Sequence, residues 1–185
     1  MKLKILRFKK VISTNTTAIR IIKNSNLNYG MVISDLQTRG RGRYGRKWIS
    51  LEGNLFVSFF YNINNFNLTM SQITERNCML VKRLISKYYK KKIIYKKPND
   101  LMINRKKICG ILQETINKFN NKFLIIGIGL NLKNDPNLSN YATTNLKDLI
   151  KKEIKKKKIE IELKNIFEKD LKKLMNNEKT QKLKC

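Results

Sequence analysis

The sequence predicts an α+β protein whose sheet is mixed but mostly antiparallel and is covered by helices on one side. The main observation is the order of the patterns: a helix among strands, then consecutive strands, then helices. The second is size, because 185 residues, 41% of them apolar, suffice for one domain with a core. We expect this domain at residues 1–150, followed by a helical tail at 151–185.

The first third of the chain alternates strand and helix patterns. Strands are expected at residues 3–12, 29–38 and 54–62. The third should lie inside the sheet, because its apolar residues fall on both faces. Between the first two strands, residues 13–24 have helical spacing, with Ser13 or Asn15 as the cap.

The clearest helix pattern covers residues 69–89. Thr69 and Gln72 have the spacing of a capping box, which predicts where this helix starts. Its expected buried stripe consists of Ile73, Leu80, Val81, Leu84, Ile85 and Tyr88.

Consecutive strands and a helical tail make up the rest. Strands are expected at residues 92–97, 106–117 and 122–132, with hairpin-like turns at 98–107 and 117–122. The apolar stripe of the tail consists of Leu163, Ile166, Phe167, Leu171 and Leu174. The lysine run at 155–158 is interpreted as a solvated turn or helix face.

Composition excludes several kinds of active site. The chain has no histidine, which removes Ser-His-Asp and Cys-His nucleophiles and histidine-bound metals. Its cysteines, Cys78, Cys109 and Cys185, have no C-x-x-C spacing and indicate a reducing compartment. No secretion signal is recognisable, and the longest apolar run, at 123–132, is too short to span a bilayer. We therefore expect a soluble, cytoplasmic protein without membrane contacts.

The net charge of +28 has two interpretations. A nucleic-acid-binding protein would carry it on a binding face. A genome rich in A/T codons would scatter lysine, asparagine and isoleucine throughout the chain, and asparagine and isoleucine are indeed dense here. We favour the second interpretation.

The segment at 37–48, "QTRGRGRYGRKW", interleaves glycine with arginine. It contains Gly40, Gly42 and Gly45 together with Arg39, Arg41, Arg43 and Arg46, and it ends in Trp48. Glycines let the backbone approach a ligand, and guanidinium groups suit carboxylates and phosphates. The segment lacks the G-K-[ST] ending of a P-loop. Without further information, it could also be a solvated basic hairpin.

Two later segments could add groups to such a site. In residues 96–112, Asn99 and Asp100 form a polar turn after Pro98, where a carboxylate could help to hold Mg²⁺. Lys107 precedes an apolar strand that contains Gly110, so its charge could point into a site. In residues 127–132, two glycines in a strand and Asn131 suggest the close approach of a ligand. Each segment alone also fits an ordinary turn or strand.

Together and in this order, these segments resemble the catalytic domain of biotin protein ligases. The resemblance rests on Ser13–Asn15, Gln37–Trp48, "SLEGNLFVS" at 50–58, "KKPND" at 96–100, "KICGIL" at 107–112 and "GIGLN" at 127–131. It covers roughly residues 8–150 and implies the fold of class II aminoacyl-tRNA synthetases and biotin ligases. The chain departs from the family in having Lys97 for tryptophan and Leu51 for proline.

The resemblance implies an ATP-dependent biotin–protein ligase that works with Mg²⁺. Biotin would be activated as biotinyl-5′-AMP and transferred to a lysine of a biotin carboxyl carrier protein or domain. We expect a monomer or weak homodimer without specific DNA binding, because no winged-helix segment is recognisable. The small C-terminal β-barrel of these ligases should be truncated or absent. The alternatives are a lipoate or octanoate ligase or transferase of the same superfamily, a basic nucleic-acid-binding protein, and a degenerate ligase, given Lys97 and the short C-terminus.

The resemblance also implies the site residues. Lys107, Arg41 and Arg43 would be catalytic. Biotin would be bound by Ser13, Thr14, Asn15, Gln37, Gly40, Arg41, Gly42, Arg43, Lys107 and Gly110. The nucleotide would be bound by Arg43, Arg46, Trp48, Asn99, Asp100 and Asn131. Asp100 is also the candidate magnesium ligand.

Overall fold

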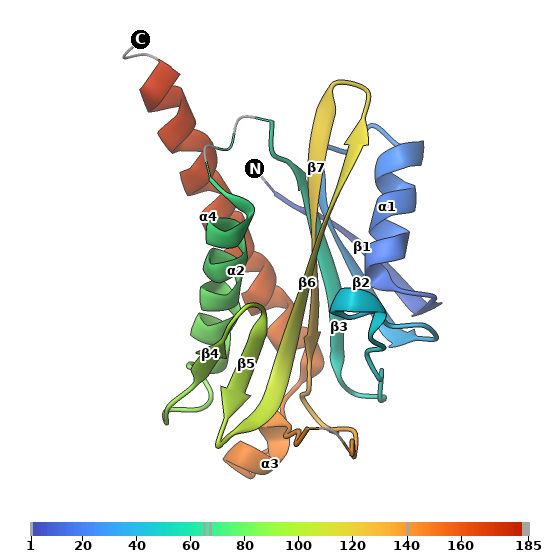
Figure 1. Cartoon of the computed structure of the whole chain (residues 1–185), viewed down its shortest axis with the longest axis vertical. Coiled ribbons are helices and arrows are strands. Elements are labelled where there is room, and N and C mark those ends of the chain that lie inside the picture. Colours follow the sequence, from blue (N-terminus) through green and yellow to red (C-terminus); the bar gives the residue numbers. More distant parts are fainter. Residues whose placement is uncertain (1, 65, 67, 140, 183–185) are drawn as a thin grey trace.

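A seven-stranded sheet forms the centre of the computed structural model, which describes residues 2–64, 66, 68–139 and 141–182 (Figure 1). Its strands are β1 (Lys4–Val11), β2 (Tyr29–Gln37), β3 (Leu55–Asn62), β4 (Ile94–Lys96), β5 (Asp100–Ile103), β6 (Lys106–Lys118) and β7 (Asn121–Leu130). Their order across the sheet is β1-β2-β3-β7-β6-β5-β4. β1 and β2 are parallel and the other neighbouring strands are antiparallel. The predicted α+β class with a mostly antiparallel sheet is confirmed.

Helices cover both faces of this sheet, so the expectation of helices on one side alone was wrong. The helices are α1 (Thr14–Asn24), α2 (Met70–Ile85), α3 (Leu146–Ile150) and α4 (Lys156–Lys182). In Figure 1, α2 and α4 lie on one side of the sheet and α1 on the other. Val32 and Phe60 pack in the cluster with α1, whereas their neighbours Met31 and Phe59 pack in the cluster with α2 and α4.

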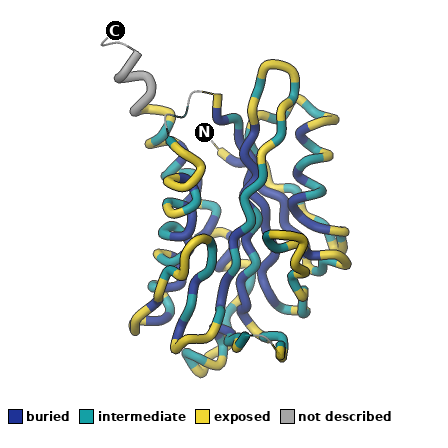
Figure 2. The backbone as a smooth tube through the Cα atoms, viewed as in Figure 1, coloured by how far each residue is buried: buried dark blue, intermediate teal, exposed yellow. Residues whose placement is uncertain are grey.

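The interior position predicted for β3 is confirmed, since β2 and β7 flank it. Buried residues run along the central strands in Figure 2, and every residue of β3 from Leu55 to Tyr61 is buried. A strand that buries both of its faces needs apolar residues at successive positions. The segment "LFVSFFY" has them at every position except Ser58.

The hairpin β5–β6 was only partly predicted. The segment at 98–107, expected as a turn, contains strand β5, in which Leu101 and Ile103 alternate as buried residues. The turn itself is confined to Asn104 and Arg105, both with positive φ, as a two-residue hairpin connection requires. The turn expected at 117–122 is confirmed between β6 and β7.

The predicted capping box of α2 is confirmed, because Thr69 and Gln72 exchange both hydrogen bonds. The helix ends at Ile85, four residues before the expected end. The expected stripe of the tail is also found, since α4 buries Leu163, Phe167 and Leu171 in the same core as the sheet. Among the described residues, no helix is long and apolar enough to cross a membrane.

Candidate functional site

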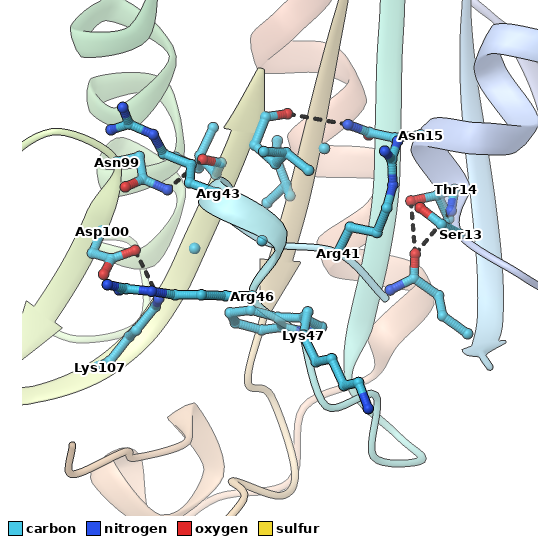
Figure 3. A pocket seen from close by; sticks show the side chains of 18 of the residues that line it. Ser13, Thr14, Asn15, Arg41, Arg43, Arg46, Lys47, Asn99, Asp100 and Lys107 are labelled. Atoms are coloured by element: carbon cyan, nitrogen blue, oxygen red, sulfur yellow. Dashed lines mark hydrogen bonds and ion pairs between the residues drawn. The ribbon is translucent and has the colours of Figure 1, made fainter. Parts of the chain in front are cut away.

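A cavity of about 400 Å³ lies between the start of α1, the Gly/Arg loop (residues 38–48) and strands β4 to β6 (Figure 3). Most of the predicted site residues line it: Ser13, Thr14, Asn15, Gln37, Arg41, Gly42, Arg43, Arg46, Trp48, Asn99, Asp100, Lys107 and Gly110. They come from segments far apart in the chain, and the sheet brings them together. Gly40 and Asn131 are not among the lining residues.

Uncharged polar groups form one end of the cavity. Gln37 Oε1 accepts hydrogen bonds from the amide and the hydroxyl of Thr14, at 2.8 and 3.1 Å. The hydroxyl of Ser58 on β3 donates to Asn15 Oδ1 at 2.5 Å, and its oxygen lies 2.8 Å from Thr14 Oγ1. Ser13 occupies the N-cap position of α1, but its side chain makes no capping hydrogen bond. Ser13 therefore does not serve as the expected side-chain cap. It lines the cavity instead.

The Gly/Arg loop is a small hairpin, and its residues 41–43 and 46–48 line the cavity. An antiparallel bridge joins Arg41 to Lys47, and the amide of Trp48 donates to the carbonyl of Gly40 at 2.9 Å. A Cβ atom on Gly40 would lie 2.5 Å from the carbonyl oxygen of Trp48, so close packing requires glycine there. Gly45 has a positive φ of 72°, and the preceding Tyr44 shares this conformation. Gly40 thus shapes the hairpin without touching the cavity.

Arg41 points toward α1 (Figure 3). Its guanidinium forms an ion pair with Glu114 of β6, with 2.7 Å between Nη2 and Oε2. The same carboxylate oxygen accepts a hydrogen bond from Asn15 Nδ2 at 2.7 Å. Arg41 therefore belongs to the polar end of the cavity, beside Asn15.

Trp48 lies against a pair of glycines on the sheet. Gly110 of β6 and Gly129 of β7 are directly paired across the strands. A Cβ atom would lie 2.8 Å from the indole ring at Gly110 and 2.4 Å from it at Gly129. Both positions must therefore remain glycine for the indole to lie this close to the sheet.

Cationic groups form the other end of the cavity. Lys107 Nζ lies 2.8 Å from Asp100 Oδ1, which makes an ion pair although the geometry is not that of a hydrogen bond. The ammonium also lies 5.5 Å from the centre of the Trp48 ring and 5.3 Å from that of Tyr141. Arg43 and Arg46 reach toward this end from the loop (Figure 3). The lysine is thus held in place by a carboxylate and two rings.

Asn99 and Asn131 are fixed by the backbone. Asn99 Nδ2 donates to the carbonyl of Ile111 at 2.7 Å, and Asn131 Nδ2 donates to the carbonyl of Thr144 at 3.1 Å. Asn131 lines a second, mostly apolar cavity of about 350 Å³, which shares Trp48 and Lys107 with the first. Asn131 Oδ1 and the indole Nε1 of Trp48 are both buried without a hydrogen-bond partner. A ligand with both a donor and an acceptor could satisfy these two atoms.

Several residues at the cavity were not predicted from the sequence. Lys47, Lys96, Met102 and Tyr141 line it, and Glu114 contacts two of its residues. Lys96 precedes Lys97, the residue that replaces the family's tryptophan. Lys97 is exposed and is not among the lining residues. Lys97 therefore forms no part of the cavity wall in this chain.

The thiols of Cys78 and Cys109 are unreactive groups of the core. Burial raises the pKa of Cys78 to about 12 and the pKa of Cys109 well above its usual value. Neither residue lines the cavity. Cys185 lies outside the described residues.

Comparison with known proteins identifies the family. The model of the Biotin/lipoate A/B protein ligase family matches residues 8–131. The chain is 35% identical over 127 residues to the bifunctional ligase/repressor BirA of Bacillus subtilis. The aligned region covers 68% of this chain and 39% of that protein. This chain thus spans well under half of that curated relative's length.

Solved structures agree with this match. The biotin protein ligase from Aquifex aeolicus in complex with biotin and ATP has a TM-score of 0.78 and 31% identity, over 92% of this chain and 71% of that one. P. falciparum LipL1 in complex with lipoate shares the fold at a TM-score of 0.61 and 14% identity, over 91% of this chain and 61% of that one. The family match, the sequence identity and the shared fold agree: the chain belongs to the Biotin/lipoate A/B protein ligase family.

Proposed function

We propose that this chain is an ATP-dependent biotin–protein ligase. The supporting observation is the polarity of the cavity, which has neutral hydrogen-bonding groups beside the Arg41–Glu114 ion pair at one end and the cations Lys107, Arg43 and Arg46 at the other. Biotin has the matching chemistry, because its ureido ring is neutral and polar and its carboxylate lies at the end of a flexible chain. In this orientation Ser13, Thr14 and Gln37 bind the ring, while Gly42 and Gly110 leave room for the chain.

The first reaction joins two anions. The carboxylate of biotin attacks the α-phosphorus of ATP, which forms biotinyl-5′-AMP and releases pyrophosphate. Lys107, Arg43 and Arg46 reduce the repulsion between the carboxylate and the phosphates and stabilise the charge that develops on the phosphoryl oxygens. The step needs no nucleophile from the protein, which is consistent with a chain that lacks histidine and buries Cys78 and Cys109.

The nucleotide is assigned to the second cavity, where it adjoins the first at Trp48 and Lys107. Trp48 and Asn131 offer an unpaired indole N–H and an unpaired amide oxygen there, which suit a base with both acceptors and donors. Asn99 and Asp100 line the adjoining wall. Mg²⁺ would be held by one or two carboxylates together with substrate phosphates, and Asp100 would supply one carboxylate.

In the second reaction, the amine of a lysine on a carrier domain attacks the carbonyl carbon of the mixed anhydride. An amide bond forms, AMP leaves, and the amine loses a proton. We assign the carrier by this chemistry to the biotin carboxyl carrier proteins.

Biotin-dependent exchange of pyrophosphate into ATP tests the first reaction, with lipoate as the control acid. We expect exchange with biotin and none with lipoate under saturating Mg-ATP. Absence of exchange with biotin would reject the proposal, and exchange with lipoate instead would assign the chain to lipoate activation.

Lys107→Ala should reduce the exchange rate by roughly 10²–10³-fold, because it removes a cation aimed at the developing charge. The matched control is Lys106→Ala, which changes an exposed lysine at the start of the same strand. Equal exchange by both variants would contradict the role of Lys107, and circular dichroism would verify that both are folded.

A further inference from the structure

Glu114 connects the Gly/Arg loop to the floor of the cavity. It lies on β6, opposite Ile125 of β7, and its Oε2 receives hydrogen bonds from two sides. Arg41 Nη2 of the loop and Asn15 Nδ2 of α1 each lie 2.7 Å from this oxygen. Within the described part of the chain, Arg41 is the one side chain of the loop that forms an ion pair with the rest of the protein.

Asn15, which Glu114 contacts at the floor of the cavity, is buried and closely surrounded. Asn15 is 3% exposed, and its Oδ1 accepts the hydroxyl hydrogen of the buried Ser58. A Cβ atom on Gly127 would lie 2.3 Å from the same Oδ1, so the sheet itself limits where the amide can lie. Asn15 Nδ2 also donates to the carbonyl of Leu112 at 3.3 Å. Glu114 thus joins a tightly held amide to a guanidinium on a loop.

The ion pair is poorly placed to stabilise the whole fold. The side chain of Arg41 is 43% exposed and that of Glu114 is 26% exposed, and solvent weakens pairs of this kind. Its effect should therefore be local, on the position of the loop. At its base, the loop is also held by Gln37 Nε2, which donates to the hydroxyl of Ser50 at 3.1 Å.

We propose that Glu114 is a positioning residue that latches the Gly/Arg loop to the tightly held amide of Asn15, and so keeps the loop closed over the cavity. The loop carries Arg43, Arg46 and Trp48, so a latched loop also places these groups over the ligand. The proposal that the ligand is biotin is a separate premise, on which only the binding measurements below depend.

Limited trypsin digestion tests the latch without any ligand. The loop contains cleavage sites after Arg39, Arg41, Arg43, Arg46 and Lys47. Glu114→Gln removes the charge while preserving the shape, and we expect it to be cleaved several-fold faster at these sites. Cleavage elsewhere should keep the wild-type rate, because the fold is unchanged. The matched control is Glu153→Gln, which breaks the exposed pair with Lys147 outside the cavity and should behave as wild type.

Equal loop cleavage in wild type and Glu114→Gln would overturn the latch, as would faster cleavage throughout the chain. Glu114→Ala provides a second test, because it removes the contact entirely and should be cleaved at least as fast as Glu114→Gln. None of these outcomes depends on which ligand the cavity binds, so a failure of the latch is distinguishable from a failure of the proposed function.

Calorimetric titration with biotin then measures the coupling. Glu114→Gln should raise the dissociation constant by about fivefold, the upper end of the range for an exposed ion pair. Adding Glu114→Gln to Arg41→Gln should weaken binding little further, because the two residues act through one contact. Additive losses in the double variant would overturn the proposal.

Discussion

Three glycines of the sheet act by leaving space for another residue. Gly127 makes room for the amide of Asn15, and Gly110 and Gly129 make room for the indole of Trp48. All three lie on β6 or β7, and Gly110 is directly paired with Gly129. A methyl group at any of them would displace a residue that lines the main cavity.

Gly129→Ala should displace the indole, because its Cβ atom would lie 2.4 Å from the ring of Trp48. Trp48 is the single tryptophan of the chain, so intrinsic fluorescence reports on it alone. We expect a red-shifted emission and easier quenching by iodide or acrylamide. In the control Gly42→Ala, the added atom would meet nothing closer than 3.4 Å, and the spectrum should not change. An unchanged spectrum in Gly129→Ala would contradict the packing described here.

Most residues of the candidate site could be predicted because they belong to contiguous motifs. Tyr141 and Glu114 could not, for different physical reasons. Tyr141 reaches the cavity because the segment after β7 runs beside Lys107, where Thr143 forms a parallel bridge, and nothing local in the sequence indicates that pairing. Glu114 resembles any polar residue of a half-buried strand until the position of Asn15 is known.

At the scale of elements, strand β3 shows why the prediction of helices on one side of the sheet was wrong. Apolar residues on both faces of β3 predicted its interior position, and they also require that both faces be covered. Helix α1 supplies the second cover through Ala18 and Ile22. Strand β5 was missed because four residues give too little alternation to separate a strand from a turn.

Helix α4 is held to the sheet by stacked rings. Phe167 lies parallel to Phe59 of β3, with 4.0 Å between the ring centroids, and both are buried. Phe167→Ala should lower the free energy of unfolding by about 3–5 kcal/mol, measured by chemical denaturation. Met175→Ala, at a 40% exposed position of the same helix, should change it by less than about 0.5 kcal/mol. Similar losses in both variants would show that the stacked pair is not the anchor.

At the scale of the whole molecule, three of the few acidic residues pair helix α4 with other elements. Glu160 pairs with Arg7 of β1, Asp170 with Arg76 of α2, and Glu162 with Lys87 just after α2. Against 13 acidic residues there are 41 lysines and arginines, so most of the cations have no carboxylate available. The positive charge is therefore a property of the surface in general, distinct from the arginines of the Gly/Arg loop.

This scattered charge should bind nucleic acid without specificity. Binding of a fluorescent random oligonucleotide, followed by anisotropy, should weaken roughly a thousandfold between about 50 and 200 mM salt if about six phosphates are contacted. Arg41→Gln should not change that dependence, because one cation of many is removed. Binding that persists at high salt, or that is lost in Arg41→Gln, would instead favour a nucleic-acid site at the Gly/Arg loop. The proposed adenylate formation should change much less over the same range of salt, because the cations assigned to it line a partly buried cavity where screening is weak.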